Sequence, residues 1–170
     1  MKPSRFPIGP GRVVGLAYTL LDEAGTILDA RPLGNPLRVI WGTGALPPAL
    51  EAPLTGLDAG TFRRLEFGPG ALFGPHDPTA VHRLPRAAHP NVQPHEPVEL
   101  TSAAGDRRLG FVTAVDADTL TVDTNHPMAG KALTVEVVVA VVEGATLAEL
   151  SAGHPIGADE DRHLWVRFAL

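Results

Sequence analysis

Apolar residues along this chain occur in short runs, and many of the runs are separated by glycine or proline. The segment 13–30 holds two such runs around a Glu-Ala-Gly turn, which is the pattern of a β-hairpin with Gly25 in the turn. The segments 35–44 and 61–67 predict two further strands, the first ending in a Gly-x-Gly loop. The pattern therefore predicts a mainly β protein.

Helical signals are confined to two short segments. Pro47 and Pro48 open the segment 47–57, and Gly56 lies near its end. Because proline suits a first helical turn and glycine suits a stop, we expect one short helix here, interrupted or ended by Pro53. The segment 145–153 predicts a second short helix or turn.

The composition changes at 69–97, which holds seven prolines and four of the seven histidines. Proline at this density excludes a helix interior and a central strand. Alternation returns at 107–124, where Asp116–Asp118 predicts a tight hairpin. In this hairpin Leu109, Phe111 and Val115 are predicted to share one face, and Leu120 and Val122 another.

The valine-rich segment 134–142 is apolar on both faces in its second half, as a central strand should be. It lies far along the chain from the first hairpin, so the intervening segment is predicted to be a module inserted into a small barrel. The expected organisation is a flexible leader at 1–12, a barrel domain at 13–75 and 127–150, an inserted module at 76–126 and a tail at 151–170.

Composition narrows the class of protein. The chain has 170 residues, 44% hydrophobic and 19% charged, which is typical of a globular protein. Its net charge of −5 argues against a nucleic-acid partner. The absence of cysteine excludes disulfides and thiol chemistry. No secretory signal or membrane span is visible, so we expect a cytoplasmic protein without a membrane partner.

Four segments together resemble the FKBP-type peptidyl-prolyl cis-trans isomerases, in their SlyD-like branch. They are the first hairpin with Tyr18 and Asp29, the loop and helix at 41–60, "LFGPHDP" at 72–78, and "NHPMAGKAL" at 125–133. The resemblance implies an FKBP-like antiparallel β half-barrel around a short helix, carrying an inserted β-rich module. It also implies a peptidyl-prolyl isomerase with folding-chaperone activity, acting on X-Pro bonds of unfolded or extended polypeptides without a covalent intermediate.

The resemblance also implies the site residues. Tyr18, Asp29 and Phe73 correspond to catalytic positions. The substrate pocket would be apolar and lined by Leu28, Leu37, Val39, Leu46, Pro47, Leu50 and Val135. In the inserted module, Val98, Leu100, Leu109 and Phe111 would contact the polypeptide. The alternative is that the apolar residues are ordinary core, and that Asp29 is a strand-end carboxylate accepting a turn hydrogen bond.

Three positions depart from the family pattern. The family usually has isoleucine where Pro47 stands, with a backbone N–H that donates to a substrate carbonyl, and proline has no N–H. It usually has tyrosine at Phe73 and phenylalanine at Val135. These changes remove two donors and one ring. We therefore expect a weak isomerase, and the alternative is a polypeptide-binding chaperone with a decayed isomerase site.

The histidines do not predict a metal site. The tail of many SlyD-like proteins is histidine-rich, but this tail has only His154 and His163. His126 is interpreted as a hydrogen-bonding loop residue. We expect no cofactor and a monomer whose partners are unfolded or proline-containing polypeptides. The apolar end of the tail, with Trp165 and Phe168, is expected to pack on a face of the protein or on a second copy.

Overall fold

The computed structural model describes residues 6–102 and 105–157. The chain divides into two units. The barrel unit comprises the chain up to Gly74 and from Gly130 onward, and the inserted unit is Pro75–Ala129. The sequence pattern predicts that the inserted unit begins at residue 76 and ends at residue 126, close to these boundaries.

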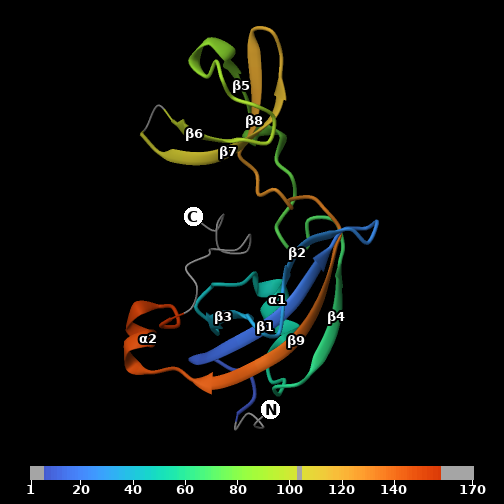
Figure 1. Ribbon diagram of the computed structural model, residues 1–170, viewed down its shortest axis with the longest axis vertical. Coiled ribbons are helices and arrows are strands. Elements are labelled where there is room, and N and C mark those ends of the chain that lie inside the picture. The colour runs from blue at the N-terminus through green and yellow to red at the C-terminus, as the bar shows by residue number, and fades with distance from the viewer. Residues whose placement is uncertain (1–5, 103–104, 158–170) are drawn as a thin grey trace. The chain divides into compact units, whose positions relative to one another are not determined.

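The barrel unit contains one antiparallel sheet. Its strands are β1 (Arg12–Leu21), β2 (Ile27–Arg31), β3 (Leu37–Ile40), β4 (Phe62–Phe67) and β9 (Leu133–Gly144). They are ordered β2-β1-β9-β4, and β3 pairs with the same edge of β1 as β2 does, further along it. Figure 1 shows the long strands β1 and β9 side by side, with α1 against the sheet. The prediction of a mainly β, FKBP-like fold with the valine-rich strand at the centre is confirmed.

Helix α1 (Pro48–Leu54) follows from its sequence. Its first residue is a proline, which loses no helical hydrogen bond there, and Gly56 beyond its end has a φ of 84°, which glycine adopts without strain. Leu50 and Leu54 are its buried residues. Pro53 lies inside the last turn, so the predicted short helix is confirmed with the proline included.

Helix α2 (Leu147–Ala152) is fixed by caps at both ends. Thr146 and Glu149 form a capping box, and Gly153 ends the helix in the left-handed conformation. The backbone N–H and the hydroxyl of Thr146 both donate to Glu149 and hold the pKa of that carboxyl below its ordinary value. The short helix or turn predicted at 145–153 is therefore confirmed as a helix.

The inserted unit holds a second antiparallel sheet, ordered β5-β8-β7-β6. Its elements are β5 (Val81–Pro85), β6 (Pro97–Thr101), β7 (Arg107–Val115) and β8 (Thr119–Asp123), with short 3₁₀ turns η1 (Pro78–Ala80) and η2 (Arg86–Ala88). The proline-rich segment supplies the edge strand β5, because an edge strand tolerates a missing donor. The core of this sheet is Val98, Val112, Leu120 and Val122.

The predicted faces of the β7–β8 hairpin are wrong for Val115, whereas Leu120 and Val122 do share one face in the core. Val112 pairs with Val122 and Val115 with Leu120, although the two β7 residues are three apart. The register shifts between Val112 and Ala114, and this irregularity turns both residues toward the same core. Leu109, expected on the same face as Val115, is 46% exposed.

The predicted flexible leader is also corrected for its described part. Ile8 is buried, its N–H donates to Leu57 O at 2.9 Å, and its carbonyl accepts from Gly56 N at 2.9 Å. The guanidinium of Arg12 lies 4.0 Å from the ring centre of Phe6. The segment is thus attached to the loop after α1. The predicted packing of Trp165 and Phe168 lies outside the described residues.

Candidate functional site

Tyr18 and Asp29 form a hydrogen-bonded pair on neighbouring strands of the barrel unit. The Tyr18 hydroxyl donates to Asp29 Oδ2 at 2.5 Å, and the Ala30 N–H donates to Oδ1 at 2.9 Å. Tyr18 is buried and Asp29 is half-buried. The two predicted polar residues are therefore in direct contact, and Asp29 is partly exposed.

Strand register places the other predicted strand residues on the same side of the sheet as Tyr18. Leu37 pairs with Leu16, Val39 with Val14, and both Asp29 and Val135 with Leu20. These β1 partners and Tyr18 are alternate residues of one strand, so their side chains project to one face. Leu28 does not follow this pattern. Leu20 of β1 pairs with Asp29 and Leu21 pairs with Ile27, so Leu28 is an extra residue of β2 with no partner on β1.

The remaining predicted residues come from α1 and the loops. Leu46 and Leu50 are buried, whereas Pro47 and Phe73 are half-buried. The Pro47 carbonyl accepts from the N–H groups of Leu50 and Glu51 at 2.9 and 3.1 Å, which fixes this residue at the start of the helix. Proline brings no N–H to this position.

Burial divides the predicted pocket into two groups. Tyr18, Val39, Leu46, Leu50 and Val135 are buried. Leu28, Asp29, Leu37, Pro47 and Phe73 are half-buried. Residues of the first group contribute to the core whether or not a ligand binds. Those of the second group are partly exposed, and all except Asp29 are apolar, so they are the ones that a ligand can contact directly.

A cavity of about 370 Å³ in the barrel unit lies elsewhere on this sheet. Its walls are formed by Glu23 and by the segments 66–69 and 132–134. It shares no residue with the predicted pocket. Two of its lining residues are glutamates, which makes it a poor match for an apolar proline ring.

The predicted contact residues of the inserted unit differ in accessibility. Val98 is only 5% exposed and belongs to the core, and Leu100 packs against that core. Leu109 is exposed and Phe111 is half-buried. The alternative interpretation, that these residues form the module's own core, therefore holds for Val98 and largely for Leu100.

A polar cluster joins the two ends of the inserted unit. His76 Nε2 lies 2.8 Å from Asp123 Oδ2, and Asn125 donates to Asp123 Oδ1 through its N–H and its side chain. Asn125 also bonds the backbone of Asp77 in both directions, at 2.9 Å each. Burial works to raise the pKa of Asp123, but the bonds from His76 and Asn125 outweigh it and leave the pKa below 3.8.

The sequence pattern did not predict this cluster, because His76 and Asp123 lie far apart along the chain. The signal was present: "GPHDP" and "DTNHP" flank the module at its two ends. His126, in the second segment, accepts from the Met128 N–H through Nδ1 at 3.0 Å, which agrees with its predicted role as a hydrogen-bonding loop residue.

Residues 6–102 and 105–157 contain neither a metal-binding cluster of side chains nor a helix that could span a membrane. No group of three or more His, Asp or Glu side chains is placed to hold a metal ion. None of the helices there has the length and apolar character that crossing a bilayer requires.

Comparison with known proteins gives the family. The chain is 34% identical over 148 residues to the FKBP-type peptidyl-prolyl cis-trans isomerase SlyD of Escherichia coli K12, covering 86% of this chain and 76% of the relative. It is 33% identical to SlyD of Treponema pallidum, covering 82% and 81%. A probable FKBP-type 16 kDa peptidyl-prolyl cis-trans isomerase of Pseudomonas fluorescens is 36% identical, covering 76% and 88%. No protein-family model matches the chain.

The similarity covers both units and extends over most of each relative. The chain therefore belongs to the FKBP-type peptidyl-prolyl cis-trans isomerases, a class of enzymes. Two of these three relatives are named SlyD, and their similarity covers 86% and 82% of this chain.

Proposed function

We propose that this protein catalyses cis-trans isomerisation of X-Pro bonds in unfolded or extended polypeptides. The observation that carries the proposal is the Tyr18–Asp29 hydrogen bond, on the same side of the sheet as Leu37, Val39 and Val135, in a chain of this family. A partly accessible polar pair beside aliphatic side chains suits a ligand with one polar bond and one apolar ring.

The reaction needs no nucleophile and no covalent intermediate. The barrier to rotation about the peptide bond is about 18–20 kcal/mol, because resonance must be broken. Water stabilises the charge-separated planar amide more than the twisted one. An apolar pocket that removes water from the bond and holds the proline ring therefore favours the twisted transition state.

In this mechanism each half-buried group has a distinct task. Asp29 accepts a hydrogen bond from a backbone N–H of the polypeptide next to the X-Pro bond, and Tyr18, whose hydroxyl donates to Asp29, holds that carboxylate in place. Phe73 and Leu37 cover the proline ring. Pro47 contributes apolar surface, but it has no N–H to bind a substrate carbonyl. The site is therefore proposed to be a weak catalyst that lowers the rotation barrier mainly by removing water from the X-Pro bond.

The inserted unit is proposed to hold the polypeptide. Among the described residues its outer strands β5 and β6 each pair with one strand only, so an extended chain can add at their other edge as a further strand. Leu109 and Phe111 supply apolar surface on β7, the neighbour of β6. Val98 is too buried to take part without opening of the module.

The second candidate function is chain binding alone, with a decayed isomerase site. It is favoured by the missing donor at Pro47 and the missing hydroxyl at Phe73. Both candidates predict suppression of aggregation, and only the first predicts faster isomerisation.

The test is a protease-free proline isomerisation assay on a short X-Pro peptide, run beside an assay of aggregation of an unfolded protein. Tyr18→Phe removes the hydroxyl bond and should lower kcat/KM by about threefold to tenfold, since such a bond contributes about 0.5–1.5 kcal/mol. The control is Glu136→Gln, whose partner is Arg64 at 2.8 Å and which should not change the rate. If the protein suppresses aggregation but does not accelerate isomerisation, the proposed isomerase activity is rejected and chain binding alone is supported.

A further inference from the structure

Arg31 is a cation placed beside the candidate isomerase site. It is the last residue of β2, and its Cα is paired with that of Tyr18. It lies two residues after Asp29, so both project to the same side of the sheet as the tyrosine. The residue is half-buried, and its Nε atom is covered.

The guanidinium of Arg31 has no anionic partner among the residues that the structure describes. Its Nε atom is buried and makes no hydrogen bond. The carboxylate nearest in sequence, Asp29, already accepts from the Tyr18 hydroxyl on one oxygen and from the Ala30 N–H on the other. Because Nε is covered, a ligand would have to bind through the terminal Nη groups, which have no carboxylate partner among the described residues.

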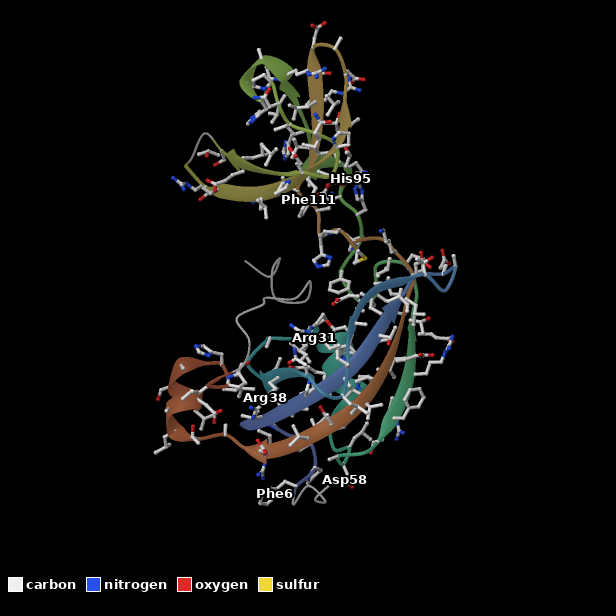
Figure 2. All side chains as sticks on the ribbon, in the orientation of Figure 1. Phe6, Arg31, Arg38, Asp58, His95 and Phe111 are labelled. Atoms are coloured by element: carbon white, nitrogen blue, oxygen red, sulfur yellow. The ribbon has the colours of Figure 1, made fainter. Side chains whose placement is uncertain are left out.

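Arg38 provides the comparison within the same sheet edge (Figure 2). Its Nε is also buried without a partner, but its Nη2 pairs with Glu143 Oε2 at 3.1 Å. Its Cα is opposite Gly15, an odd-numbered position of β1, so it projects to the face away from Tyr18. Of the two arginines, Arg31 alone lies on the site's side of the sheet.

We propose that Arg31 determines substrate specificity by pairing with the carboxylate of an aspartate or glutamate that flanks the proline of the bound polypeptide. Arginine can present its two Nη groups as a fork that matches the two oxygens of a carboxylate. The partly buried setting strengthens the attraction relative to open water. This inference rests on the proposed isomerase function and names the substrates that the site prefers.

The experiment compares peptides that are identical except for Glu or Gln at the position before, or the position after, the proline. Glutamine keeps the size and removes the charge. In the intact protein the Glu peptide at one of these positions should have a kcat/KM about 3- to 10-fold higher than its Gln counterpart, mostly through KM. The ratio should fall toward one as salt is raised.

Three variants separate recognition from a structural role. Arg31→Gln should bring the Glu/Gln ratio to one while leaving the rate on Gln peptides unchanged. Arg31→Lys should keep part of the preference, because it retains the charge without the fork. Arg38→Gln, the control, should keep the full ratio. A uniform loss of rate on all peptides in Arg31→Gln would show a structural role and overturn the inference.

Binding of the same labelled peptides, read by fluorescence anisotropy, separates this inference from the proposed function. Failure to accelerate any peptide would reject isomerase activity, but a tighter Glu peptide that depends on Arg31 would still support charge recognition at this site. Equal rates and equal affinities for the Glu and Gln peptides at both positions would overturn the inference, whatever the catalytic result.

Discussion

The barrel unit and the inserted unit are both antiparallel sheets, but they are stabilised differently. In the barrel unit the long strand β1 is buried along most of its length, its neighbour β9 is buried mainly at alternate residues, and α1 adds Leu50 and Leu54. In the inserted unit the core is one cluster, Val98, Val112, Leu120 and Val122, with a few half-buried neighbours. The barrel unit therefore has a continuous core, and the inserted unit has a small one.

A small core leaves little margin for folding, because a short domain buries a smaller fraction of its surface while each ordered residue costs the same chain entropy. The inserted unit adds polar bonds where its two ends meet, around Asp123 and Asn125. We therefore expect the inserted unit to open readily, which would help it to accept extended chains, while the barrel unit stays folded.

Removal of the inserted unit should have the largest effect on chain binding. Gly130 N–H donates to Gly74 O at 2.9 Å, so the two ends of the barrel chain already meet. Replacing 75–129 with a short glycine-rich bridge should leave a folded barrel, because short loops close at low entropic cost. Aggregation suppression should be lost while the rate on short peptides persists. Loss of cooperative unfolding in this variant would contradict the two-unit description.

Substitution of a core leucine in each unit is the second test. Leu120→Ala should cost about 2–5 kcal/mol, enough to unfold the inserted unit but not the barrel. Leu20→Ala, also fully buried, should cost a similar amount and lower the stability of the barrel without unfolding it. Hydrogen exchange followed by mass spectrometry reads each unit separately. Equal loss of protection over both units in Leu120→Ala would show that they unfold as one.

Restoring the family residues at the catalytic face is the third test. Pro47→Ile with Phe73→Tyr should raise kcat/KM by about 10- to 100-fold, if each restored bond contributes about 1.4 kcal/mol in the transition state. Pro47 has an extended backbone, φ −57° and ψ 135°, which isoleucine also adopts. Aggregation suppression should not change. An unchanged rate would mean that the present residues serve the pocket equally well.

Acidification gives the smallest expected effect. The pKa of Asp123 is below its ordinary value of 3.8, so its contribution to stability is complete above 3.8 and is lost as pH falls through the folded-state pKa. The inserted unit should therefore lose protection from exchange before the barrel does. Partial exposure of the pair limits the size of the effect.

The matched variants are Asp123→Asn, which should remove this step of the acid dependence, and the exposed Asp118→Asn, which should not. Acid loss of protection that is identical in all three proteins would reject the role of Asp123.

Local patterns predicted much of the architecture because they depend on short-range physics. The run of valines in β9 indicated a central strand, Pro48 and Gly56 bounded α1, and Gly25, with φ 81°, lies in the hairpin turn. The Tyr18 and Asp29 pair came from the family motif. The prediction that Leu109 and Val115 share a face was wrong, because an alternating sequence pattern does not reveal where a strand carries an extra residue.

The sequence by itself determined where strands and turns lie, which family the chain resembles and which residue types line the candidate site. Only the tertiary structure decided the register of β2 on β1, the bulge at Leu28 and the position of Arg31 beside Tyr18. Register is non-local: a shift of one residue sends every side chain of a strand to the other face, and the choice depends on packing against residues far along the chain.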